Sequence, residues 1–194
     1  MFLNSLSGRF LILTIVFVML AEVFIFVPSV ARFREDYLLS RLERAQIASL
    51  ALLAADDMID PALEEELLAN AGVFNVVLRR DEVRQLVLSS PIPQPISNSY
   101  DLRDPAAWEL IRDALADLVD PQDRVIRVIG EPVKEAGLLI EVTMETAPLR
   151  AAILSYGVRI LMLSAVISVI TAVLLFLAVQ RLLVMPIRRV VRSM

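Results

Sequence analysis

Four arginines and two aromatic residues form the densest set of side chains able to bind a ligand. They are Arg79, Arg80, Arg84 and Arg103, with Tyr100 and Trp108 close by in the chain. Guanidinium groups bind carboxylate and phosphate through paired hydrogen bonds, and aromatic rings supply the apolar walls of a pocket. We expect these six residues to line a site for an anionic ligand. The alternative is that the arginines belong to the solvated face of a hairpin.

Other chemistry is limited by composition. The chain contains no histidine and no cysteine, which excludes His-based catalysis, thiol chemistry and most zinc, haem and copper sites. It also has no Gly-rich phosphate loop and no serine-nucleophile motif. We therefore expect no catalytic residue, metal site or cofactor in this chain, and no nucleic-acid partner. One acidic set could bind a divalent cation, although helix capping already accounts for half of it: Asp56, Asp57, Asp60, Glu64, Glu65 and Glu66.

Two long apolar runs predict transmembrane helices. Ile160–Val179 carries no charge, and a helix of this length crosses the ~30 Å hydrocarbon core of a bilayer. Phe10–Val27 is a second run, which we interpret as a membrane anchor rather than a cleaved signal peptide. The predicted spans are residues 10–30 and 160–181. Glu22 lies inside the first span, either as a functional carboxylate or near enough to its end to reach the interface or Arg32.

The charge distribution predicts the orientation. Outside the enclosed segment, in the two spans and the termini, Glu22 is the single acidic residue. The basic residues in the same parts of the chain are Arg9, Arg181, Arg188, Arg189 and Arg192. The enclosed segment is acidic. Because basic flanks stay cytoplasmic, we expect residues 1–9 and 182–194 inside the cytoplasmic membrane and residues 31–159 outside it, in the periplasm or extracellular space.

The enclosed segment is predicted to be one α+β domain with a mixed, mainly antiparallel sheet. Asp60-Pro61 and Asp104-Pro105 are helix-start signals, and Asn70-Ala71-Gly72 is a helix-stop signal. The predicted order is helix 37–55, helix 61–70, strand 73–78, strand 83–89, an irregular loop through Pro91 and Ser97–Ser99, helix 106–119, strand 124–129 and strand 138–144.

Two faces predict helix packing. In the membrane-proximal helix, one stripe at heptad spacing either packs on the domain's own sheet or meets a twin helix in a homodimer. A second stripe runs beside it through Leu39, Gln46, Leu50 and Leu53. In the second span, small residues recur every four positions and favour close helix contact. The first stripe is Leu38, Leu42, Ala45, Ser49 and Leu52, and the small-residue face is Ser164, Ser168 and Ala172.

The last residues begin an amphipathic helix. Pro186 follows the second span, and apolar positions with arginines between them recur after it: Ile187, Val190, Val191 and Met194. We expect these five residues to transmit a signal out of the membrane, and the rest of that element to lie beyond Met194.

This layout, ending in Val184-Met185-Pro186-Ile187-Arg188-Arg189-Val190, resembles the input half of bacterial membrane-bound sensor histidine kinases. The resemblance implies a PAS-like outer sensor domain, a homodimer, and a HAMP linker beginning at residue 182. It further implies a small-molecule or protein stimulus, and a downstream kinase domain that would use ATP and Mg²⁺ and phosphorylate a cognate response regulator. Those catalytic parts are not in this sequence.

Three other classes remain open. The same layout precedes chemoreceptor signalling domains and nucleotide cyclases. A membrane-anchored protein whose outer domain binds an assembly partner would also fit, and an enzyme acting outside the membrane is the least favoured reading because no catalytic set is present.

Overall fold

The computed structural model describes residues 6–54, 60–80, 83–132 and 139–179. These residues form two compact units. Residues 27–156 make up the mixed α+β unit, and the described residues up to Phe26 and from Gly157 onward make up the other. The predicted signal-transmission residues, Pro186, Ile187, Val190, Val191 and Met194, lie outside the described residues, as do Asp56 and Asp57.

Two long helices begin and end the described chain. Helix α1 runs from Leu6 to Ala54 and α4 from Thr146 to Val179. Each contains a window long and apolar enough to cross a membrane, with a mean hydropathy of 2.1 in α1 and 2.2 in α4. Large apolar side chains in these windows are exposed, for example Phe24 at 74% and Met162 at 68%. That exposure distinguishes the two helices from the buried core helix of a soluble protein.

Helix α1 has no break between the predicted span and the predicted membrane-proximal helix. It continues through Pro28, although a proline lacks the N–H that would bond to the carbonyl of Phe24, one turn earlier. Helix α4 begins at Thr146, directly after the last strand, and Pro148 lies in its first turn. A proline is tolerated there because the first-turn N–H groups have no partner within the helix.

A five-stranded sheet forms the centre of the α+β unit, in the order β2-β1-β5-β4-β3. The strands are β1 (Asn75–Arg80), β2 (Val83–Ser89), β3 (Ile96–Asp101), β4 (Val125–Gly130) and β5 (Leu139–Glu145). The predicted hairpin is confirmed as the antiparallel pair β1–β2.

One detail of the predicted sheet is wrong, because strand β3 occupies residues that we predicted to be part of an irregular loop. The predicted mixed pairing is confirmed: β3 pairs parallel with β4, and the β1–β2, β1–β5 and β4–β5 pairs are antiparallel. The parallel pair is possible because α3 (Ala107–Val119) lies between the two strands and provides the crossover connection that parallel strands need.

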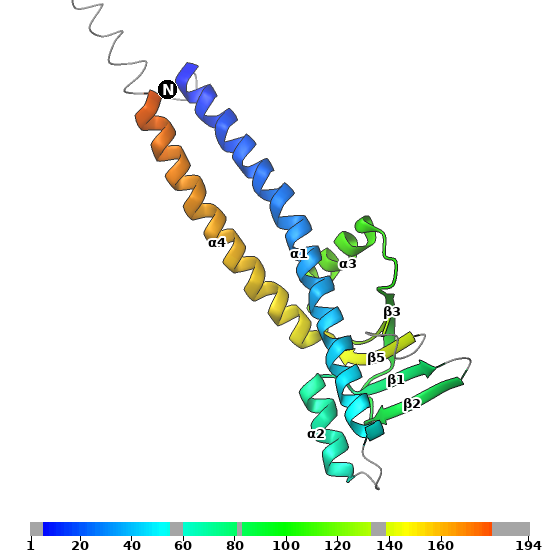
Figure 1. The fold of residues 1–194 in the computed structure, drawn as a ribbon. Helices are drawn as coiled ribbons and strands as arrows, with labels where there is room; N and C mark the ends of the chain where they lie inside the picture. The colour runs from blue at the N-terminus through cyan, green and yellow to red at the C-terminus, as the bar shows by residue number, and fades with distance from the viewer. Residues whose placement is uncertain (1–5, 55–59, 81–82, 133–138, 180–194) are drawn as a thin grey trace, which may run out of the picture. The chain divides into compact units, whose positions relative to one another are not determined.

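Helix α1 crosses one face of this sheet (Figure 1). At the closest approach, a Cβ added to Gly130 of β4 would lie 2.5 Å from the Leu42 side chain. The sheet residues on that face are fully buried and include Val76, Val128, Ile140, Val142 and Met144. Leu149 and Ile153 of α4 are buried as well, so α1 and the start of α4 both contribute to the hydrophobic core.

The two short helices differ in how closely they follow their predicted caps. Helix α2 (Pro61–Ala71) has Asp60 as its N-cap, accepting from the Ala62 N–H at 3.1 Å, and Gly72 as its left-handed C-cap. Both predicted signals are confirmed. Helix α3 instead takes Ala106 as its N-cap, and the Glu109 carboxylate accepts from the Ala106 N–H at 3.4 Å. Asp104 is therefore not the cap that its position before a proline predicted.

Candidate functional site

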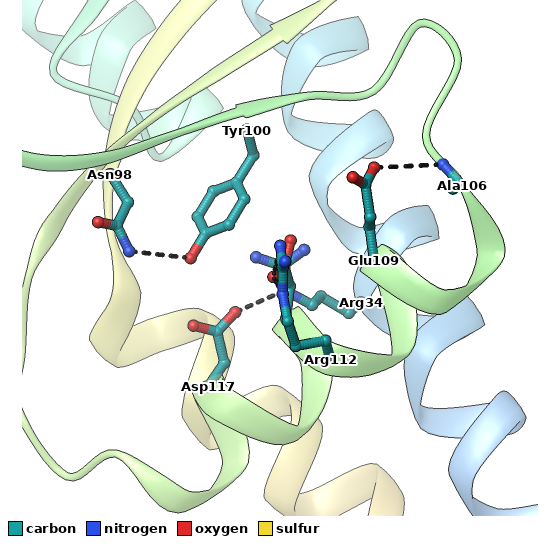
Figure 2. Close-up of polar contacts among 8 residues, drawn as sticks. Arg34, Asn98, Tyr100, Ala106, Glu109, Arg112 and Asp117 are labelled. Atoms are coloured by element: carbon teal, nitrogen blue, oxygen red, sulfur yellow. Dashed lines mark hydrogen bonds and ion pairs between the residues drawn. The ribbon is translucent and has the colours of Figure 1, made fainter.

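A buried arginine joins three elements of the α+β unit. Arg34 of α1 is 1% exposed. Its Nε donates to Oδ2 of Asp117 in α3 at 2.5 Å, and its guanidinium carbon lies 4.4 Å from the ring centroid of Tyr100 in β3. Figure 2 shows the three side chains converging from their separate elements. The ion pair and the cation–π contact keep this charge in a site where water cannot solvate it.

A small pocket lies beside this cluster. It is lined by Asn98 and Tyr100 of β3, Asp117 and Asp120 at the end of α3, Gln122, Arg124 and Ile126 at the start of β4, and Thr146 and Arg150 at the start of α4. Its cavity volume is about 20 Å³, which holds one or two water molecules and is far below the volume of a typical metabolite pocket. The lining is polar, so the pocket is suited to a few oriented hydrogen bonds.

The start of α4 is fixed to the start of β4 by two reciprocal hydrogen bonds. The Thr146 N–H donates to the Arg124 carbonyl at 2.8 Å, and the Arg124 N–H donates to the Thr146 hydroxyl at 2.9 Å. The Arg124 side chain forms an ion pair with Asp120. A change in the pocket would therefore act directly on the first turn of α4.

Four of the six predicted ligand-binding residues have described side chains: Arg79, Tyr100, Arg103 and Trp108. Of these four, Tyr100 lines the pocket and the other three do not. Arg103 is exposed, and its guanidinium donates hydrogen bonds of 2.6 to 3.2 Å to the Asp101 carboxylate. This hydrogen bonding holds the pKa of the Asp101 carboxyl below its usual value. Trp108 is 60% exposed, with the Arg112 guanidinium 4.9 Å from its ring.

The hairpin arginines lie in strands away from these pocket residues in the sheet order. Arg79 is exposed in β1, and the register places Arg84 of β2 opposite it. Arg80 faces Val83 in the same register. β1 and β2 are separated from β3 by β5 and β4 in the sheet. The exposure of Arg79 fits the solvated-face alternative at that position, and the side chains of Arg80 and Arg84 lie outside the described residues.

Sequence reasoning missed the residues that matter most here, above all Arg34, Asp117 and Arg150. A signal for Arg34 was present. The buried stripe through Leu38 and Leu42 extends backwards at helical spacing to Arg34, and an arginine on a core stripe must have a buried partner. Asp117 and Arg150 gave no such local signal, since only the tertiary fold brings them together.

The helix stripe is explained within one chain. Leu38, Leu42, Ala45, Ser49 and Leu52 are all buried in the single chain, which is the packing expected of the face against the domain's own sheet. On the neighbouring stripe, Leu39 and Leu50 are each 41% exposed, and Ile47 beside them is 61% exposed.

The small-residue face of α4 has one defined contact. The Ser168 hydroxyl donates to Oε1 of Glu22 in α1 at 2.8 Å, while Ser164 is half-buried and Ala172 is exposed. A Cβ added to Gly157 would lie 3.4 Å from the Phe26 ring. Arg32 is paired with Glu35 and Asp36 at 3.9 and 3.6 Å.

Within the described residues, no group of three or more acidic side chains is arranged to hold a metal ion. The two pocket carboxylates, Asp117 and Asp120, are each paired with an arginine. The site is thus a polar pocket built on arginine–aspartate pairs. No protein-family model, curated protein or solved structure matches the chain.

Proposed function

We propose that this chain is the stimulus-sensing membrane region of a bacterial sensor histidine kinase. In this proposal α1 and α4 cross the cytoplasmic membrane, residues 31–159 form a PAS-like sensor domain outside it, and residues 182–194 begin a HAMP linker. The two helices with exposed apolar windows support membrane insertion. The five-stranded sheet with α1 across one face supports a sensor domain of this type.

One observation carries the proposal. Helix α4 begins at Thr146, a residue that lines the pocket, and it is the same helix that contains the charge-free run predicted to cross the membrane. A ligand or stress that favours one of two packings around Thr146 would rotate or shift this helix. A helix of this kind transmits a small displacement without a change of fold.

A homodimer completes the proposed mechanism. Leu39, Ile47 and Leu50 are exposed beside the buried stripe of α1, and the helical repeat places the three on one side of the helix. We propose that a second copy of the chain packs here. The α1 helices of the two protomers would then lie side by side, and a movement of α4 in each protomer would be measured against this fixed pair of helices.

Fusion tests the function. Residues 1–194 are joined in register to the remaining linker and kinase core of a histidine kinase, and autophosphorylation is measured in membranes. We expect regulated phosphorylation that changes when residues 37–144 are deleted, with the kinase core alone as control. Output that is indifferent to the deletion would refute a sensory role and favour the partner-binding alternative. Parallel fusions to a chemoreceptor or a cyclase output distinguish the type of output.

A further inference from the structure

Arg34 has hydrogen-bond donors that nothing in the described residues satisfies. Its Nε is bonded to Asp117, but Nη1 and Nη2 are buried and have no acceptor. Arg150 has the same deficit at its buried Nε. Buried charged donors are almost always paired, and each exception calls for an explanation.

Both arginines belong to the surroundings of the pocket. Arg150 lines it, and Arg34 contacts two lining residues, Tyr100 and Asp117. Figure 2 shows the ion pair of Arg34 with Asp117 as a dashed line, with the Tyr100 side chain close by. Thr146, another lining residue, is 8% exposed, and its hydroxyl, which already accepts from the Arg124 N–H, still has a hydrogen to donate.

The charges around the pocket do not cancel. Arg34 is paired with Asp117, and Arg124 with Asp120. Arg150 has no carboxylate partner among the described residues, which leaves one positive charge in excess. This excess disfavours a cation. Water would fill the space and accept some hydrogen bonds, but it would leave the charge uncompensated.

We propose that this pocket binds a small oxyanion, of the carboxylate or phosphate type. Arg150 supplies the charge and the unpaired Nε donor, and the Tyr100 and Thr146 hydroxyls are further donors. Arg34 contacts both the Tyr100 ring and Asp117, and it therefore positions these two lining residues. The cavity of about 20 Å³ has room for one or two oxygens of such a group, and the remainder of the ligand would lie in its mouth.

This inference rests on the proposed function, because it names the ligand class of the same sensor unit. It also places the ligand on the element that would carry the signal. Thr146 and Arg150 occupy the first two turns of α4, so an anion bound between them and Tyr100 would stabilise one position of α4 relative to β3.

The test is direct binding to the full chain in lipid nanodiscs, without any kinase. Thermal unfolding and calorimetry are measured with sodium acetate and with sodium phosphate, each against sodium chloride at matched ionic strength. We expect a saturable rise in Tm with at least one of the two anions. Acetate saturating at the lower concentration identifies a carboxylate ligand, and phosphate doing so identifies a phosphate ligand.

Variants locate the site. Losing one charge-assisted hydrogen bond weakens binding about ten-fold or more, so we expect that loss for Arg150→Gln and a smaller one for Tyr100→Phe. Arg103→Gln is the matched control, since Arg103 is exposed and paired with Asp101, and it should bind like the parent chain. Arg150→Lys keeps the charge but lacks the Nε donor, so partial recovery is expected if the charge itself contributes.

Two outcomes overturn the proposal: no anion raising the Tm beyond sodium chloride, or Arg150→Gln binding as tightly as the parent chain while remaining folded. Neither depends on kinase output. If no anion binds but the kinase fusion responds, the oxyanion site is refuted and the sensory role stands. If an anion binds but the fusion does not respond, the oxyanion site stands and the sensory role is refuted.

Discussion

Arg34 and Asp117 are 83 residues apart in the chain, and their side chains meet at 2.5 Å inside the α+β unit. The arginine is 1% exposed and the aspartate side chain 13% exposed. Arg34 therefore depends on Asp117 for compensation of a charge that water does not reach. The pair connects α1 to α3 next to the candidate pocket, so its energetics determine how firmly α3 is held on α1.

Removing one partner of this ion pair should lower the free energy of unfolding much more than removing both. Asp117→Ala leaves Arg34 buried without a counter-charge, and we expect a loss of about 3 kcal/mol in the free energy of unfolding. The double variant Arg34→Met with Asp117→Leu keeps the volume apolar and should lose far less. Chemical denaturation of the full chain, followed by near-ultraviolet circular dichroism, compares them. Equal losses in the single and double variants would show that the ion pair is not the determining contact.

The left-handed C-cap of α2 gives a second prediction. Gly72 has φ of 67°, and a Cβ there would lie within 2.8 Å of the Arg41 guanidinium carbon, whose Nη1 donates to the Ala71 carbonyl at 2.9 Å. Gly72→Ala should cost about 2 kcal/mol of stability, about half from the backbone conformation and half from displacing Arg41.

The control for this prediction separates the two causes. In an Arg41→Ala background the contact is absent, and Gly72→Ala should then cost only the backbone part, about 1 kcal/mol. If the cost is the same in both backgrounds, the contact with Arg41 contributes nothing to the requirement for glycine.

The Asp101–Arg103 pair predicts a specific pH dependence. Hydrogen bonding from Arg103 lowers the pKa of Asp101 in the folded chain below 3.8. As the pH falls, the Asp101 carboxyl therefore becomes protonated in the unfolded chain before it does so in the folded chain. The stabilisation from the pair is present above pH 3.8 and is lost as the pH falls through the folded pKa. Both side chains are 44% exposed, so the contribution should be below about 1 kcal/mol.

Carboxyl NMR titration checks this shift. In Arg103→Gln the pKa of Asp101 should rise toward 3.8, while the overall stability at neutral pH changes little. An Asp101 pKa that stays low without Arg103 would assign the shift to another donor.

Local patterns predicted much of the fold, because their causes lie within a few residues. Asp60 caps α2 through its own side chain, Gly72 ends it through its own φ, and the short apolar runs of β4 and β5 are sufficient to predict strands. The apolar runs in α1 and α4 were equally local signals.

The failures have non-local causes. Strand β3 has the sequence Ile-Ser-Asn-Ser-Tyr-Asp and is mostly exposed, so neither its composition nor its burial marks it as a strand. Its hydrogen-bond partners in β4 come from beyond α3. The pocket depends on the same arrangement. Tyr100, Asp117 and Arg150 meet only after β3, α3 and α4 are placed, which explains why the predicted site contained Tyr100 but not its neighbours.

Topology is tested by chemical labelling. In the proposed topology the basic flanks and both termini are cytoplasmic, so a cysteine at exposed Ser99 should react with an impermeant thiol reagent in intact cells, and a cysteine at Ser193 should not. The chain has no native cysteine, so no background substitution is needed. Labelling at Ser193 and protection at Ser99 until the cells are lysed would reverse the proposed orientation.

The homodimer is tested on the two faces of α1. Leu39, Ile47 and Leu50 are exposed, whereas Leu38, Leu42 and Ala45 are buried against the chain's own core. If a second copy covers the exposed face, single cysteines at Leu39, Ile47 and Leu50 should form disulfide-linked dimers in membranes under mild oxidation, because paired residues of a helix seam lie within disulfide reach. Cysteines at Leu42 and Ala45 are the matched controls and should remain monomeric, since they point into the protomer.

Crosslinking that also occurs at Glu43, on the same exposed face, would strengthen the assignment. If folded protein is present and neither face crosslinks, the exposed stripe does not pair with its own copy and the proposed dimer must be built from other residues. If the buried face crosslinks instead, the stripe through Leu38 and Leu42 is an exchange surface between protomers, and the packing of α1 on the sheet of its own chain would be replaced by packing between chains.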